Sequence, residues 1–243
     1  NRVILPTYAS QRKSYWVEAP TLNESSKKLQ NDFVSNYDNK NVLGRITNSK
    51  LLKTIIFDTI FSVDHIHYCK EHKVFGEIVI PGAGHISMFL EAVKNQLGSS
   101  KCELNDIIFP NALVVSINEN KSVQLTMVSQ KNHYELNLIS EGNTNELVVH
   151  ASCKMATLSA NEAIIDFKPL KQLISEEVPV TLFYTGFENR QIELGASFRC
   201  VEKLWSGKNQ SLAKLRIPDI TPHTGDWEIP PGLMDSCIQI LMA

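Results

Sequence analysis

Residues 72–82 read HKVFGEIVIPG, and this stretch decides how the rest of the chain is interpreted. It places Gly76 four residues after His72, and Pro81 five residues after the glycine. Residues 74–80 are rich in Val, Ile and Phe, which favours a β-strand ended by Pro81 and Gly82. An imidazole titrates near neutral pH, so a histidine at the entrance to such a strand can serve as a general base.

The stretch leads directly into an amphipathic helix. Apolar residues recur at helical spacing after Gly82, at Ile86, Phe89, Leu90, Val93 and Leu97. Gly98 follows as a typical C-terminal stop. His85 falls off this apolar face, so it is expected to matter less than His72.

Length and composition indicate a globular protein with one large domain or two small ones. Apolar residues make up 43% of the 243 positions, which is enough for a substantial core. The net charge of −2, without a basic stripe, argues against nucleic acid as the main partner. No apolar run approaches the ~20 residues of a membrane span, and no signal peptide is expected. A cytoplasmic protein without membrane contact is therefore expected.

Cysteine and histidine spacing gives little support for a disulfide framework or a metal site. Five scattered cysteines without a CxxC pair favour reduced thiols. His65, His67 and His72 lie close together, but no cysteine or carboxylate cluster accompanies them. Loop histidines are therefore favoured over metal ligands.

A series of short strands surrounds the predicted helix. Residues 55–63 read as a strand, and apolar residues again dominate or alternate over 106–117, 122–128, 134–138 and 146–155. Turn residues fall between them at 118–121, 130–132 and 141–143. One long helix among antiparallel strands predicts an α+β layer in which a sheet wraps around the helix.

The C-terminal part repeats this plan. A mixed segment over residues 158–177 reads as a link, and strands follow within 183–205 and 211–217. Residues 232–243 then read as an apolar helix, in which Asp235 and Gln239 share one face at i, i+4. An aspartate in this setting either caps the helix start or is kept protonated for use as an acid. The pattern alone favours the cap.

Several segments, in order, resemble signatures of the dehydratase domains of modular type I polyketide synthases and related fatty acid synthases. Residues 72–82 look like HxxxGxxxxP, and residues 235–239 look like DxxxQ. Residues 183–198 are similar to the segment that ends in GYxYGPxF. Residues 41–46 resemble the HPLLGxR entry, with Val42 in place of its proline. Residues 5–16 are similar to the linker that follows an upstream ketosynthase or acyltransferase.

This resemblance implies a double hot-dog, in which two antiparallel sheets each wrap around one long helix. The implied organisation is a linker over residues 1–20 and an N-terminal hot-dog with the histidine over 21–160. A linker over 161–178 and a C-terminal hot-dog with the aspartate over 179–243 complete it. The second hot-dog is expected to be C-terminally incomplete.

The resemblance also implies a reaction. A β-hydroxyacyl thioester, carried on the phosphopantetheine arm of an acyl carrier protein, would lose water to give an α,β-unsaturated thioester. By analogy His72 removes the α-proton, Asp235 protonates the departing hydroxyl and Gln239 orients the carboxyl group. Two groups whose surroundings push their pKa values apart can run such an elimination.

Further site residues follow from the same resemblance. Backbone N–H groups after Pro81 would stabilise enolate character at the thioester carbonyl. No metal, nucleotide or other cofactor is implied, and the expected partners are neighbouring synthase domains and a second copy in a homodimer. The motif and tunnel residues are Gly76, Pro81, Gly82, Leu194, Gly195 and Phe198.

The chain departs from the family pattern in one segment. Gln191 replaces a glycine, Ile192 and Leu194 replace two tyrosines, and Ala196 replaces a proline. Pro230 stands where many members have a histidine. Two alternatives to dehydration therefore stay open: a related double-bond isomerase or ring-forming (oxa-Michael, pyran-type) domain, and a non-catalytic scaffold.

Overall fold

The computed structural model describes residues 42–64, 66–142, 146–158, 174, 176–217 and 227–243. The chain divides into two units, Asn1–Tyr37 and Asp38–Ala243, and every described element belongs to the second. The segment expected to be a linker over residues 1–20 and most of the link over residues 158–177 lie outside the described residues. None of the described helices is long and apolar enough to cross a membrane.

Residues 72–80 form a hairpin rather than one strand. β3 (His72–Val74) and β4 (Glu77–Ile80) pair antiparallel, with Val74 opposite Glu77. The two residues between them, Phe75 and Gly76, have φ angles of 54° and 81°. Two left-handed residues in a two-residue loop are what a tight hairpin turn requires. The single strand predicted over residues 74–80 is therefore wrong, because the apolar run conceals a turn at Gly76.

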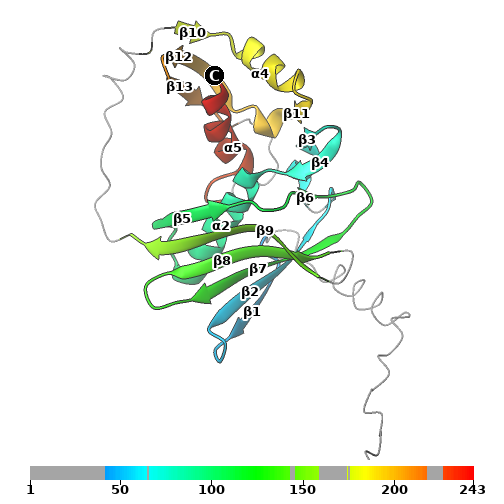
Figure 1. Cartoon of the computed structure of the whole chain (residues 1–243), viewed down its shortest axis with the longest axis vertical. Helices are drawn as coiled ribbons and strands as arrows, with labels where there is room; N and C mark the ends of the chain where they lie inside the picture. Colours follow the sequence, from blue (N-terminus) through cyan, green and yellow to red (C-terminus); the bar gives the residue numbers. More distant parts are fainter. Residues whose placement is uncertain (1–41, 65, 143–145, 159–173, 175, 218–226) are drawn as a thin grey trace, which may run out of the picture. The chain divides into compact units, whose positions relative to one another are not determined.

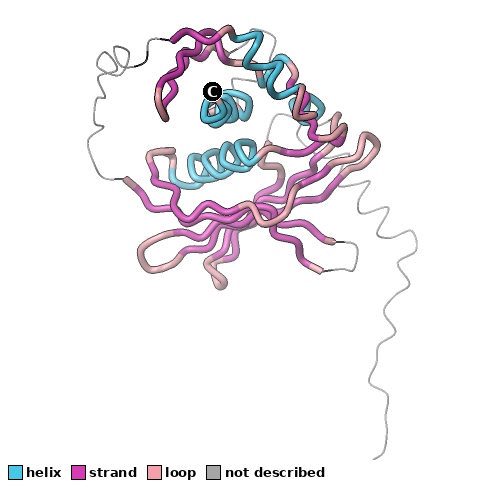
Figure 2. Tube along the Cα trace, turned by 45° about the horizontal axis from the view of Figure 1, so that its top comes forward, coloured by secondary structure: helices cyan, strands magenta, loops and turns pink. Residues whose placement is uncertain are grey.

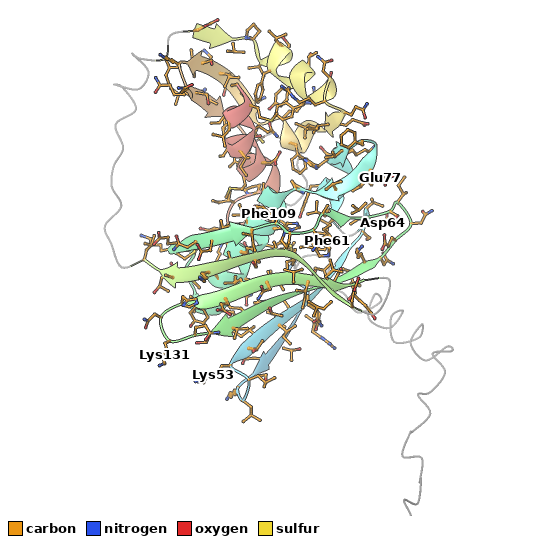
Figure 3. The ribbon with its side chains drawn as sticks, in the orientation of Figure 1. Lys53, Phe61, Asp64, Glu77, Phe109 and Lys131 are labelled. Atoms are coloured by element: carbon orange, nitrogen blue, oxygen red, sulfur yellow. The ribbon has the colours of Figure 1, made fainter. Side chains whose placement is uncertain are left out.

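A six-stranded antiparallel sheet forms most of the first half (Figure 1). Its strands are, in spatial order, β1 (Arg45–Ser49), β2 (Thr54–Phe61), β7 (Lys121–Ser129), β8 (Tyr134–Glu141), β9 (Leu147–Thr157) and β5 (Cys102–Ile108). The meander β7–β8–β9 follows the strands and turns predicted from the alternating pattern. Lys53 and Lys131 mark the turns at one end of this sheet (Figure 3).

The helix α2 (Gly82–Leu97) lies across one face of that sheet (Figure 2). Inward-facing side chains of alternate strand positions pack against it and form one apolar core. The largest fully buried members include Phe57, Phe61, Met88, Phe89, Leu125, Met127, Leu136, Leu138 and Met155. Gly98 ends the helix with φ 71° and donates its N–H to the Lys94 carbonyl, as predicted.

The buried face of α2 is rotated relative to the predicted one. Met88, Phe89, Ala92 and Val93 are buried, whereas Leu97 is 38% exposed. The buried positions also include the small residues Ala83, Ser87 and Ala92, which the spacing of the largest aliphatic residues did not indicate.

The second half has its own, smaller core. A three-stranded sheet contains β10 (Glu176–Val178), β12 (Val201–Gly207) and β13 (Gln210–Leu215), and α5 (Pro231–Gln239) continues into a 3₁₀ turn at Ile240–Met242. The helix α4 (Val180–Glu188) was not predicted. Its Phe183, Tyr184 and Phe187 pack together in the second core.

A four-stranded sheet connects the two halves. Its order is β11 (Ile192–Leu194), β3, β4 and β6 (Leu113–Val114). β11 belongs to the second half and pairs antiparallel with β3, with Leu194 directly opposite His72. Helices α2 and α5 also contact each other. Segments more than a hundred residues apart in sequence are thereby held beside His72.

Candidate active site

His72 is held by the hairpin in one orientation and one tautomer. The residue is 9% exposed, and its Nδ1 lies 2.8 Å from the carbonyl oxygen of Val79 on the opposing strand. A carbonyl can only accept a hydrogen bond, so Nδ1 carries the hydrogen. In the neutral ring Nε2 then keeps its lone pair, which is the state that a general base requires.

Asp235 lies in the middle of α5, so the prediction that it caps the start of this helix is wrong. The helix begins at Pro231, its N-cap position is Pro230, and no side chain caps it. The Asp235 carboxylate instead accepts a 2.6 Å hydrogen bond from Nε2 of Gln239, one turn later. Burial raises the pKa of Asp235 above its ordinary value, and the Gln239 hydrogen bond and the nearby His72 partly oppose that rise. A carboxyl group with a raised pKa is suited to donating a proton.

Gln239 connects Asp235 to a segment of the second half. Its Nε2 donates to the carbonyl oxygen of Phe198 at 3.0 Å as well as to Asp235. Ser236 donates to the same carbonyl at 3.2 Å and accepts from the backbone N–H of Cys200 at 3.3 Å. Since Gln239 is 4% exposed and Ser236 is fully buried, these bonds hold α5 in a fixed rotation.

Phe198 brings the two functional groups to one site. Its ring is fully buried and its centroid lies 5.3 Å from that of His72, while its carbonyl holds Gln239. His72 is also close enough to Asp235 for its charge to lower the pKa of that carboxyl group. The structure therefore places His72, Asp235 and Gln239 together, with Phe198 between the two halves.

The altered segment over residues 191–196 contributes a backbone hydrogen bond to the β3–β4 turn and the apolar side chain of Leu194 to the surroundings of the site. Leu194 is 6% exposed and packs in the second core beside Phe198. Gln191 has a φ of 58°, and its carbonyl accepts the N–H of Phe75 at 2.9 Å. A hydroxyl at position 194 is thus replaced by an apolar contact, opposite His72 in the strand register.

The start of α2 is shaped by a close aromatic contact. A Cβ on Gly82 would lie 3.0 Å from the ring of Phe109, so this position leaves little room for a side chain. Figure 3 labels Phe109 in this region. The first-turn N–H groups of Gly84 and His85 both donate to the Pro81 carbonyl.

His85 is buried, contrary to the prediction that it lies off the buried face of its helix. His85 is 2% exposed rather than off the buried face, and its ring lies 6.0 Å from that of Phe109. Burial, with a smaller contribution from His150, lowers the pKa of His85 to about 3. The ring is therefore neutral in the folded protein.

Ser236 was not predicted to belong to the site. Its position beside Asp235 could have indicated it, but the carbonyl that accepts its hydrogen bond, that of Phe198, lies 38 residues away in the sequence.

We expect the buried His85 to make the domain sensitive to acid. The unfolded chain protonates this ring near pH 6.5, whereas the folded protein keeps it neutral down to about pH 3. Lowering the pH between these values therefore favours unfolding, by up to about 1.4 kcal/mol per pH unit. Urea unfolding of His85→Leu at several pH values should show a flatter dependence than the parent. Parallel dependences in the two proteins would contradict this role.

Gly232, at the start of α5, leaves no room for a larger residue. A Cβ there would overlap the carbonyl oxygen of Ser197. Gly232→Ala should lower the free energy of unfolding by roughly 3 kcal/mol, although alanine is the better helix former. The matched control is Gly186→Ala in α4, where the nearest atom is the movable Arg190 guanidinium at 3.4 Å. Thermal melts in which both variants match the parent would refute the tight contact.

No group of three His, Cys, Asp or Glu side chains with the geometry to hold a metal ion occurs in the described part of the chain. His65 lies outside that part, so the histidine cluster around it is not tested.

Two helices packed on antiparallel sheets, with the imidazole of β3 close to a carboxyl group of α5, form a candidate acid–base site in a hot-dog arrangement. The family model described as polyketide synthase dehydratase domain matches residues 41–141. A second, described as polyketide synthase dehydratase N-terminal domain, matches residues 166–243. The chain belongs to the polyketide synthase dehydratase domains, a family whose reaction class is that of a hydro-lyase.

Solved structures support the fold. The dehydratase domain from the CurJ module of curacin polyketide synthase is 29% identical, with a TM-score of 0.76 over 82% of this chain and 70% of that one. The corresponding domain of the CurF module has a TM-score of 0.76 at 24% identity, and this similarity supports the fold alone. The predicted double hot-dog is confirmed, and the chain covers about 70% of the matched CurJ domain.

Curated relatives are much longer than this chain. Polyketide synthase PksM of Bacillus subtilis is 23% identical over 97% of this chain but only 6% of its own length. For PksN of the same organism the identity is 24%, over 98% of this chain and 4% of the relative. The chain thus corresponds to one small part of these large synthases.

Proposed function

We propose that this domain eliminates water from a β-hydroxyacyl thioester to give the α,β-unsaturated thioester. One observation carries the proposal: His72, with Nε2 free to accept a proton, and Asp235, with a raised pKa, meet beside Phe198. A base and an acid with opposite protonation at the same pH are what an elimination requires.

The proposed reaction uses both groups without any cofactor. Nε2 of His72 takes the α-proton, and negative charge develops at the thioester oxygen, near the N-terminus of α2. Asp235 gives its proton to the β-hydroxyl, the carbon–oxygen bond breaks and water leaves. Transfer of a proton from the His72 imidazolium to the Asp235 carboxylate, directly or through water, restores the starting state. Gln239 keeps the carboxyl group oriented throughout.

The substrate is proposed to arrive on the phosphopantetheine arm of an acyl carrier protein. Membership in the polyketide synthase dehydratase domains supports this. The relatives named as polyketide synthases are also far longer than this chain, which matches only a few per cent of their length. We propose accordingly that neighbouring synthase domains belong to the same polypeptide, that the domain pairs as a homodimer and that it works in the cytoplasm.

A second candidate is a related isomerase or ring-forming domain. Its support is the apolar Leu194 opposite His72, where the family pattern has a tyrosine hydroxyl. Without that tyrosine, a hydrogen bond to the substrate hydroxyl is lost. His72 would then remove a proton from another position of the substrate.

A product analysis separates these candidates. The domain is incubated with synthetic 3-hydroxyacyl and enoyl carrier-protein thioesters, and the products are identified by mass spectrometry and chromatography. Dehydration predicts loss of one water from the hydroxyacyl thioester. A product isomeric with the enoyl substrate, or a cyclised product from a substrate with a distal hydroxyl, would favour the second candidate. Unchanged substrates would favour a scaffold.

A further inference from the structure

Glu71, the residue immediately before His72, makes three hydrogen bonds to the second half of the molecule. Its Oε2 accepts from both the backbone N–H and the hydroxyl of Ser197, each at 2.8 Å. Its backbone carbonyl accepts from the N–H of Gly195 at 2.7 Å. The residue beside the base is therefore fastened to a segment 126 residues away in the sequence.

The segment that Glu71 contacts, Ser197 and Phe198, is also hydrogen-bonded to the helix that carries Asp235. Ser197 precedes Phe198, whose carbonyl receives the hydrogen bonds of Gln239 and Ser236. Gln239 in turn donates to Asp235. A continuous series of covalent and hydrogen bonds thus connects His72 to Asp235 through Glu71 and the Ser197–Phe198 backbone.

Glu71 and Gly195 pack so closely that a side chain at position 195 would not fit. A Cβ on Gly195 would lie 2.5 Å from Oε2 of Glu71 and 2.7 Å from its Cβ. The absence of a side chain at Gly195 is what lets the Glu71 carboxylate reach Ser197. Neither Glu71 nor Ser197 is required to touch the substrate for this arrangement to matter.

We propose that Glu71 is a positioning residue, which sets the placement of His72 relative to Asp235 by anchoring the Ser197–Phe198 backbone. The proposal rests on the dehydratase function proposed above. Its physical basis is that proton transfers at two adjacent carbons require both groups at the correct distance at once. A misplacement of about 1 Å can cost about a hundredfold in rate.

The first test compares the kinetics of matched variants in the whole domain. Glu71→Ala should lower kcat for dehydration by about 10-fold to 100-fold while KM stays close to the parent value. Glu71→Gln keeps the side-chain length and one acceptor oxygen, so it should recover much of the loss. Ser197→Ala removes only the hydroxyl bond and should have a smaller effect than Glu71→Ala.

Glu193 provides the control. It lies opposite Lys73 on the same pair of strands, but its side chain is 63% exposed and makes a 3.7 Å ion pair with Lys73. Glu193→Ala should leave kcat unchanged, because exposed ion pairs contribute little. If Glu71→Ala fails to fold, Ser197→Ala decides the matter, because it removes one of the hydrogen bonds to Glu71. A parent-like kcat in Ser197→Ala, together with a parent-like effect of His72→Phe on the pKa of Asp235, would then overturn the proposal.

A second readout does not depend on activity. The side-chain carboxyl carbon of Asp235 is followed by NMR as pH is varied, with and without His72→Phe. In the parent, removing His72 should raise the pKa of Asp235, because the His72 charge lowers it. In the Glu71→Ala background the same change should produce a clearly smaller rise, since the two groups are no longer held together.

The two readouts separate the proposals. If the parent forms no enoyl product but Glu71→Ala reduces the coupling between His72 and Asp235, the proposed function fails and the positioning role stands. If the parent dehydrates its substrate and Glu71→Ala matches it in both kcat and coupling, the positioning role is overturned.

Discussion

Replacing His72 with alanine should lower the rate of water elimination by at least about two decades, the usual contribution of a general base. The hairpin should persist, because the substitution removes only one side-chain hydrogen bond, to the Val79 carbonyl. The two-residue turn and the pairing of Lys73 with Ile78 do not depend on the imidazole. Turnover of a 3-hydroxyacyl carrier-protein thioester, measured beside a thermal melt, tests this expectation.

His133 supplies a matched control for that experiment. It lies between β7 and β8, is 32% exposed at its side chain and contacts Glu135 at 3.6 Å. His133→Ala should retain parent turnover. An unchanged rate in His72→Ala would refute the base assignment. A loss as large in His85→Gln as in His72→Ala, with both proteins folded, would indicate that the wrong histidine was chosen.

The second large effect is expected at Asp235. Asparagine has nearly the same shape as aspartate but cannot deliver a proton to the leaving hydroxyl. Asp235→Asn should therefore melt near the parent temperature, still bind the acyl carrier substrate and lose elimination by at least about two decades. Because burial disfavours the charged form of Asp235, a neutral amide there should not weaken the fold.

An exposed aspartate provides the comparison. Asp106 has a side chain that is 67% exposed and pairs with Lys154 at 2.8 Å, which lowers the pKa of its carboxyl group. Asp106→Asn should retain full turnover. If Asp235→Asn also kept full turnover with an unchanged melt, the acid role would be lost and isomerisation or a scaffold role would gain support.

Local patterns predicted much of the first half. Alternation of Val123, Leu125 and Met127 identified β7 and its inward face, and Gly98 marked the end of α2. Those signals are local, since they depend on a period of two or on one glycine. The β3–β4 hairpin was missed because Phe75 adopts a left-handed conformation that its side chain does not favour.

The structure brings together residues that the sequence singled out, but the hydrogen bonds that connect them were not predicted. The spacing of Asp235 and Gln239 indicated their shared face, and the structure joins them by a 2.6 Å hydrogen bond. Their meeting with His72 followed from family resemblance, because no periodicity in the sequence predicts it. Glu71 and Ser197 lie 126 residues apart, and each reads alone as an ordinary polar surface residue. Only the pairing of β11 with β3 makes them neighbours.

The division of labour between base and acid can be measured in one experiment. The parent, His72→Ala and Asp235→Asn are incubated in deuterium oxide with a 3-hydroxyacyl carrier-protein thioester. Deuterium at the α-carbon of remaining substrate and formation of enoyl product are then followed by mass spectrometry. We predict enoyl product from the parent, neither change with His72→Ala, and deuterium uptake without enoyl product with Asp235→Asn. Enoyl product formed at the parent rate by either variant would contradict the assignment of His72 as base and Asp235 as acid.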